Sequence, residues 1–175
     1  MDYDALLRKH RKRLLISPED VAFKLQIGRR DIERILPHRE PFLLLDRLTG
    51  IDLAGELITG TRTVCRDDPV FEGHFPESPV YPGVLELEMI GQLGLCLHYF
   101  LEHQVTEIGS DARPVPIRAT RTLGAYYLEP VLPGAEVTLI AKKLEFDGFL
   151  ARIIGQAVTA GKVCCVAIGE GYLIN

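Results

Sequence analysis

The segment from Val84 to Gln104 constrains the fold of this chain more than any other feature. It contains no proline, and leucine, methionine, isoleucine and phenylalanine occupy almost every side of the helix that it predicts. A helix that is apolar all round must be enclosed by other parts of its own protein. We therefore expect one long buried helix with the rest of the chain packed around it.

The regions on both sides of this helix have the composition of β-strands. Apolar and β-branched residues fill the segments 42–48, 57–65, 115–123, 126–128, 135–146, 149–159 and 163–173. Turn signals separate the later segments at Pro133-Gly134, Asp147-Gly148 and Ala160-Gly161, and Asp-Gly is typical of a tight hairpin. One helix inserted among successive hairpins predicts an α+β protein whose antiparallel sheet curls around the helix.

The chain's 175 residues suffice for one domain whose core needs no metal or disulfide. Residues 1–40 carry ten basic and seven acidic side chains, a balance of +3, whereas residues 41–175 carry ten and seventeen, a balance of −7. The overall acidity argues against nucleic-acid binding. Because the sequence has no signal-peptide pattern and no membrane-length apolar run, we expect a cytoplasmic protein without an integral membrane segment.

The first 34 residues are expected to form a helical extension. Leucines flank a basic run from Arg8 to Arg13, which suits a short amphipathic helix that ends before Ser17. Ser17 would cap a second helix with Pro18 in its first position, continuing to Gly28. We interpret the basic run as a solvated helix face, with a docking patch or a membrane-surface helix as alternatives.

His74 is the first candidate for chemistry, since it lies in the loop Gly73-His74-Phe75-Pro76 with further prolines nearby. Histidine exchanges protons near neutral pH, and a restricted backbone lowers the entropy cost of placing it as a base. A histidine that merely bonds a loop carbonyl is the alternative. The surrounding pattern must therefore support the interpretation.

That pattern continues at Pro82-Gly83, where the long helix begins and its first free amides could hold the developing charge of a thioester carbonyl oxygen. Ordinary helix initiation is the alternative. Glu88 and Gln92 share one helix face, whereas Glu86 points about 200° away from Glu88, so only one carboxyl can face a given pocket. Burial of a carboxyl in an apolar helix favours its protonated, proton-donating form.

The remaining reactive residues give weaker signals. His38 is interpreted as a structural loop residue, and His98 and His103 have a poor spacing for a shared metal, so no metal site is assigned. The four cysteines lack a Cys-x-x-Cys spacing and read as buried thiols. No phosphate-binding glycine loop or nucleophile elbow is present in the sequence.

Three strings together resemble the β-hydroxyacyl-acyl-carrier-protein dehydratases of fatty acid synthesis, a hot-dog-fold family: ILPHREPFLLLDR, FEGHFPESPVYPGVLELEMIGQLG and EPVLPGAEV. The resemblance runs from about Ile35 to the C-terminus, so residues 35–175 are expected to form the hot-dog domain behind the extension of residues 1–34. It implies dehydration of a (3R)-hydroxyacyl thioester on acyl carrier protein to the trans-2-enoyl thioester, without a cofactor.

The resemblance also implies roles for particular residues. His74 and Glu88 would be the catalytic pair, the Gly83 amide would bind the thioester carbonyl, and Gln92 would orient Glu88. The active site would form between two subunits of a homodimer or higher homo-oligomer, with His74 of one subunit facing Glu88 of its partner.

Departures from the family pattern occur around this site. Ser78 and Tyr81 stand where the family often has histidine and methionine. The stretch 125–129 lacks the family's basic residues, so any role of theirs in docking the acidic carrier is either absent here or has moved to the basic front segment. Tyr81 and Phe75 are expected to line the substrate tunnel, with core packing as the alternative. A thioesterase using Glu88 to activate water and a non-catalytic carrier-binding subunit are the alternative functions.

Overall fold

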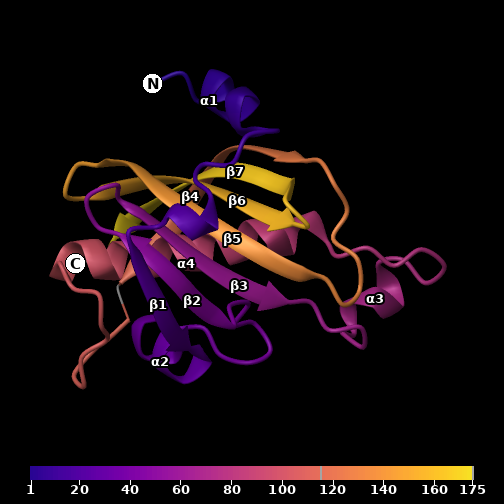
Figure 1. Ribbon diagram of the computed structural model, residues 1–175, viewed down its shortest axis with the longest axis horizontal. Helices are drawn as coiled ribbons and strands as arrows, with labels where there is room; N and C mark the ends of the chain where they lie inside the picture. The colour runs from indigo at the N-terminus through magenta and orange to yellow at the C-terminus, as the bar shows by residue number, and fades with distance from the viewer. Residues whose placement is uncertain (115, 175) are drawn as a thin grey trace.

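The computed structural model describes residues 1–114 and 116–174 (Figure 1). The strands are β1 Phe23–Gly28, β2 Arg47–Asp52, β3 Leu57–Thr63, β4 Ile117–Tyr127, β5 Glu136–Phe146, β6 Leu150–Thr159 and β7 Lys162–Leu173. The helices are α1 Tyr3–His10, α2 Arg29–Ile35, α3 Val70–Gly73 and α4 Gly83–His103, with a 3₁₀ turn at Pro18–Asp20. The strands form one sheet in the order β1-β2-β3-β5-β6-β7-β4, and every neighbouring pair is antiparallel.

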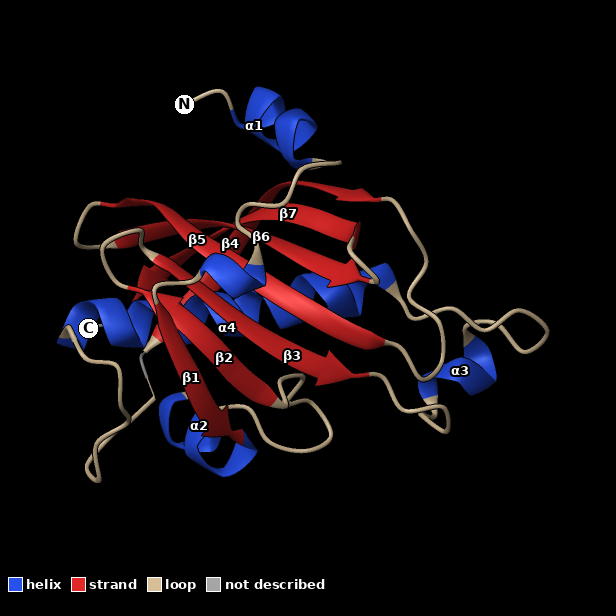
Figure 2. Cartoon of the chain, viewed as in Figure 1, coloured by secondary structure: helices blue, strands red, loops and turns tan. Residues whose placement is uncertain are grey.

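Helix α4 lies against the inner face of this curved sheet, as Figure 2 shows, and the expected hot-dog arrangement is confirmed. Met89, Leu93 and Phe100 are completely buried between helix and sheet. The helix ends at Gln104, which adopts a left-handed conformation with φ 53° and donates its backbone N–H to the carbonyl of Phe100. By length and composition α4 could cross a membrane, but 61% of its apolar window is buried in this protein. Enclosure by the sheet therefore accounts for its apolar character.

The hairpins predicted at Asp147-Gly148 and Ala160-Gly161 are confirmed, since β5 pairs with β6 and β6 with β7, whereas Pro133-Gly134 is a turn between β4 and β5, which are not neighbours in the sheet. Gly134, Gly148 and Gly161 have φ values of 84°, 90° and 76°, which glycine adopts without the strain that a side chain would cause. The two strands expected at 115–123 and 126–128 are one strand, β4, with two irregularities in its pairing to β7. Residue 115, where the first was expected to start, lies outside the described residues.

The helix expected between Ser17 and Gly28 is wrong. Only Pro18–Asp20 forms a helical turn, and Phe23–Gly28 is strand β1, paired with β2. The apolar residues Val21, Phe23, Leu25 and Ile27 recur at every second position, which is the period of a strand and not of a helix. The extension is therefore helical at α1 but contributes an edge strand to the sheet, and the domain boundary at residue 35 stays a prediction.

The strand expected at Phe42–Leu48 is also wrong, because strand β2 begins only at Arg47. Leu43, Leu44 and Leu45 are all buried without strand pairing, and their loop turns back through hydrogen bonds from Phe42 and Leu43 to the carbonyl of Arg39. A run of consecutive apolar residues does not separate a strand from a buried loop. Packing against α4 decides the outcome here.

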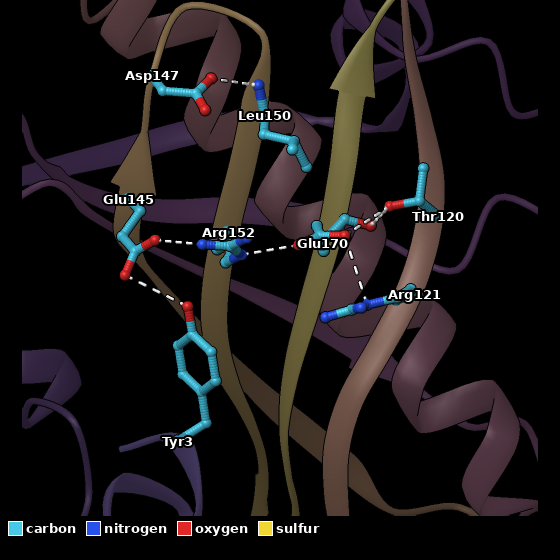
Figure 3. Close-up of polar contacts among 8 residues, drawn as sticks. All are labelled: Tyr3, Thr120, Arg121, Glu145, Asp147, Leu150, Arg152 and Glu170. Carbon is cyan, nitrogen blue, oxygen red and sulfur yellow. Dashed lines mark hydrogen bonds and ion pairs between the residues drawn. The ribbon is translucent and has the colours of Figure 1, made fainter. Parts of the chain in front are cut away.

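Helix α1 packs on the outer face of the sheet, over β4 and β7, at the top of Figure 1. Leu7 is 1% exposed, and its side chain lies so close to Gly124 that a Cβ there would approach its Cδ1 to 2.6 Å. The phenol of Tyr3 donates to Glu145 at 3.3 Å, and Glu145 pairs with Arg152, which also donates to Glu170 at 2.7 Å (Figure 3). Apolar burial and this polar row together fix α1 on the sheet.

Gln156 of β6 fixes the turn that follows α1. Its side-chain amide is fully buried, donates to the carbonyls of His10 and Arg13 at 2.8 and 2.9 Å, and accepts from the backbone N–H of Leu15 at 2.8 Å. Without Gln156 the His10 carbonyl and the Leu15 N–H would lose this partner, whereas the Arg13 carbonyl also lies 3.2 Å from Nδ1 of His10. The amide of Gln156 therefore replaces the backbone pairing that this turn lacks.

Replacing Gln156 with leucine is expected to release this turn, because the His10 carbonyl and the Leu15 N–H lose their partner at a cost of about 1–3 kcal/mol for each buried group left unpaired. Tryptic cleavage after Arg11, Lys12 and Arg13 should become at least about tenfold faster, since a tenfold population change needs only about 1.4 kcal/mol. The exposed Gln26→Leu variant is the control. Equal cleavage rates in wild type and Gln156→Leu would contradict this role.

Candidate active site

His74 follows α3 and is held by its loop through three hydrogen bonds. Its backbone N–H donates to the carbonyl of Val70 and its carbonyl accepts from Val80 N–H, both at 3.0 Å. Its Nδ1 lies 2.8 Å from the carbonyl of Val80, so Nδ1 carries the hydrogen and donates it. In the neutral imidazole this leaves the lone pair on Nε2. The carbonyl contact and a base role are therefore compatible, because the contact selects the tautomer that exposes Nε2.

The other predicted residues of this region lie around His74 and the start of α4. Phe75 is 54% exposed and stacks on the His74 ring, with centroids 4.2 Å apart. Tyr81 is 2% exposed and packs against Phe71 in the core, and burial raises the pKa of its phenol to about 12. Gly83 opens α4, and a Cβ there would lie 2.5 Å from the Tyr127 ring. Glycine is therefore required by close packing at the helix start.

A second group of residues surrounds Glu88. Gln92, one turn further along α4, donates to Glu88 Oε1 at 2.9 Å. His38 Nε2 approaches the same oxygen at 3.3 Å from the loop after α2. Gln92 also donates to the carbonyl of Phe42 and accepts from Leu44 N–H, both at 2.8 Å. The predicted orienting role of Gln92 thus has a structural basis, because its one amide holds Glu88 and two backbone groups of the loop before β2.

The two carboxyls of α4, Glu86 and Glu88, differ in protonation. The sequence predicted that burial protonates a helix carboxyl, and this holds for Glu86 and not for Glu88. The hydrogen bond from His38 lowers the pKa of Glu88, opposed by burial and assisted by the hydrogen bond from Gln92. Glu86 is 3% exposed with an Oε2 that has no hydrogen-bond partner among the described residues, and burial raises its pKa to about 8. Glu88 is therefore a carboxylate at neutral pH in this chain, and Glu86 is the protonated acid.

A cavity of about 520 Å³ runs along α4, between the helix and one end of β4, β6 and β7. His38, Glu88 and Gln92 line one part of it, and the rest is mostly apolar or glycine positions such as Leu95 and Gly91, with a few polar and charged residues that include Lys143 and Glu170. The lining does not include His74, Phe75, Tyr81 or Gly83. Within one chain the structure therefore brings Glu88 and Gln92 together and leaves the predicted residues of the 70–83 segment outside this cavity.

His38 is the polar residue of this site that sequence reasoning missed. Its side chain is 20% exposed, its Nε2 faces Glu88, and its Nδ1 is buried without a hydrogen-bond partner among the described residues. Arg39 holds the loop by donating to the carbonyls of Leu36 and His38 at 2.8 and 2.6 Å. The available signal was the Leu36-Pro37-His38-Arg39 string, but no local periodicity links it to a helix fifty residues later.

Comparison with known proteins identifies the family of this chain. A family model described as a FabA-like domain matches residues 36–167. The chain is 30% identical over 155 residues to a 3-hydroxyacyl-[acyl-carrier-protein] dehydratase FabZ of Xanthomonas oryzae, covering 85% of this chain and 97% of that protein. It is 35% identical over 136 residues to the enzyme of the same name from Oceanobacillus iheyensis, covering 78% and 91%. The chain belongs to the FabA-like family.

Solved structures support the fold. The dehydratase heterocomplex ApeI:P from Xenorhabdus doucetiae matches with a TM-score of 0.59 and 19% identity, covering 82% of this chain and 91% of that one. The Escherichia coli PaaI protein matches with a TM-score of 0.54 and 14% identity, covering 73% and 78%. At these identities the likeness establishes the shared hot-dog fold, which the resemblance predicted.

Proposed function

We propose that this protein removes water from (3R)-hydroxyacyl thioesters carried on the phosphopantetheine arm of acyl carrier protein, giving trans-2-enoyl thioesters in fatty acid or related lipid biosynthesis. The observation that carries the proposal is the Glu88 carboxyl held by Gln92 and His38 at the wall of a largely apolar cavity. The dehydratases named among its relatives support the substrate class. We place the reaction in the cytoplasm.

The proposed reaction moves two protons in opposite directions. Nε2 of His74 takes the α-proton, and the electron pair of that C–H bond moves toward the thioester carbonyl, whose oxygen the Gly83 amide holds. The bond between the β-carbon and the hydroxyl oxygen then breaks, and protonated Glu88 gives its proton to the leaving group, forming water. The side chains carry both transfers, so the proposal needs no cofactor.

We propose that this site forms between two subunits, with His74 of one subunit facing the partner subunit's Glu88. Among the described residues no hydrogen bond or ion pair joins His74 to Glu88 within the chain, and His74 does not line the cavity beside Glu88. A reaction that needs both groups at one substrate is therefore served by a homodimer or a larger homo-oligomer.

His38 poses the question of how Glu88 becomes an acid. Because His38 lowers the pKa of Glu88, the protonated fraction needed for dehydration is small at neutral pH. We propose that His38 positions the carboxyl and sets the pH at which dehydration declines. The rate should fall as pH rises through the pKa of Glu88, since the proton donor is lost above it.

Replacing His38 with alanine is expected to move this alkaline decline of kcat/KM to higher pH, because Glu88 loses the hydrogen bond that stabilises its charge. His38→Gln, whose side-chain amide can donate from about the position of Nε2, should restore the wild-type profile. The measurement is kcat/KM for dehydration across pH. A rate lowered equally at every pH in His38→Ala would assign His38 a structural role only.

The proposed function is tested by adding purified protein to a carrier-linked 3-hydroxyacyl thioester and following enoyl absorbance and free thiol together. Enoyl formation without thiol release is expected. Thiol release without enoyl would indicate the thioesterase alternative, and neither product with several chain lengths would indicate a non-catalytic carrier-binding subunit.

A further inference from the structure

The basic residues of the extension form one exposed surface. Its members, which we call the basic front surface, are Arg8, Lys9, Arg11, Lys12 and Arg13. Among the described residues a carboxylate partner is present only for Arg8, whose guanidinium lies 3.8 Å from exposed Asp4. Since residues 41–175 carry a net charge of −7, this cluster is a positive surface on an otherwise acidic protein.

The basic front surface is held rigidly in place. Leu7 is buried under α1, and Gln156 fixes the carbonyls of His10 and Arg13. Figure 3 shows Tyr3 of α1 reaching the row of charged residues that crosses the sheet. A partner that binds here does not have to order a flexible tail, so little binding energy is lost to backbone ordering.

The apolar face of α1 distinguishes among possible partners. A helix that binds a membrane surface inserts its apolar face into the lipid. The apolar face of α1 is not free to do so, because Leu7 is 1% exposed and packs in a cluster with Ile154, Val166 and Ile168 of the sheet. The basic side chains of the helix, Arg8 and Lys9, are exposed, which suits binding to an acidic protein surface.

The basic front surface also lies close to the predicted carbonyl-binding position. The Arg11 guanidinium is 4.7 Å from the centroid of the Tyr126 ring. The next residue of β4, Tyr127, has its ring against Gly83 at the start of α4. Successive residues of a strand point to opposite faces, so the thickness of one sheet separates Arg11 from the Gly83 amide.

We propose that the basic front surface docks the acidic carrier protein that delivers the acyl substrate, an inference that rests on the proposed function. The strand segment 125–129 of this chain has no basic residue. The extension places a positive charge beside this strand, because the Arg11 guanidinium lies over the Tyr126 ring. The thioester of the carrier has to reach the Gly83 amide. A carrier docked at the basic front surface is separated from that amide by the thickness of one sheet.

The test reverses two charges that have no partner among the described residues, in the variant Lys9→Glu/Lys12→Glu. The matched control is Arg30→Glu/Arg113→Glu, which makes the same charge change at exposed residues on α2 and in the segment after α4. Each is assayed with 3-hydroxydecanoyl-acyl carrier protein and with the N-acetylcysteamine thioester of the same acid.

For the carrier-linked substrate the KM of Lys9→Glu/Lys12→Glu should rise about tenfold or more, and added salt should weaken wild type but not the variant. Its kcat, its activity on the small thioester and all values of the control should stay near wild type. An unchanged carrier KM, or equal losses on both substrates, would overturn the proposal. Loss of binding to phosphatidylglycerol vesicles with an unchanged carrier KM would replace it with a membrane surface.

Failure of the proposed function is distinguishable from failure of this inference. If wild type converts neither substrate, binding of the loaded carrier protein is measured directly by titration calorimetry. Weaker binding by at least about tenfold in Lys9→Glu/Lys12→Glu, and not in the control, would uphold docking by a non-catalytic protein. Equal affinity of all three proteins would overturn it.

Discussion

Replacing Glu88 with glutamine lowers the rate of enoyl thioester formation by about 10²–10⁴-fold, because the amide cannot give a proton to the leaving hydroxyl. His74→Ala is expected to cause a loss of similar size, since the α-proton then has no base. Combining both changes should cost little more than either alone, as is usual for groups that act in one step. The measurement is the absorbance of the enoyl product at saturating carrier-linked substrate.

Two controls separate this loss from misfolding. Glu102→Gln changes an exposed carboxyl near the other end of α4 and should leave the rate near wild type. Glu88→Gln should keep its hydrogen bond with Gln92 and therefore its thermal unfolding midpoint. Activity retained within about tenfold in either catalytic variant would remove that residue from the mechanism.

The same variants test whether the site spans two subunits. His74→Ala and Glu88→Gln proteins are each nearly inactive, but a mixed dimer contains one site with both native groups. After subunit exchange at equal concentrations, random pairing predicts recovery of about a quarter of the wild-type activity. No recovery, with subunit exchange verified by mass spectrometry, would place both residues of a site in one chain.

Replacing Glu86 with glutamine is expected to stabilise the protein increasingly as pH rises. In the folded chain burial raises the pKa of Glu86 to about 8, whereas an unfolded glutamate titrates at the ordinary value of 4.5. The protonated carboxyl is fully accommodated below the unfolded value, and stability is lost as pH rises from there through the folded value. The quantity compared is the free energy of unfolding of the glutamine variant minus that of wild type. This difference should be about 2–4 kcal/mol larger at pH 7 than at pH 4.5.

Urea unfolding at several pH values between 4.5 and 8.5 measures this difference. Glu77→Gln, in the exposed part of the histidine loop, is the control and should show no such trend. A stability difference that does not change with pH would mean that Glu86 is paired or hydrated in the native protein. Glutamine is chosen because it has nearly the shape of the protonated acid, so packing is the same in both proteins.

Local sequence signals were sufficient for much of this fold. Helix α4 follows from a proline-free segment with apolar residues on every side, and the later hairpins follow from glycines at positions that require positive φ. The local signals failed where two kinds of secondary structure have the same amino-acid composition. The leucines of 42–48 are as apolar in a buried loop as in a strand, and the alternation from Val21 to Ile27 indicated a strand that the helix-capping signal at Ser17 obscured.

The sequence by itself determined that a buried helix carries Glu88 and Gln92 on one face, and that a proline-rich loop presents His74 before it, because these features depend on spacing along the chain. Only the tertiary structure decided how these groups are charged and held. The contact of His38 with Glu88 joins residues fifty positions apart, and the unpaired burial of Glu86 depends on which side of α4 the sheet covers. Protonation follows from neighbours in space, and spacing along the chain does not specify those neighbours.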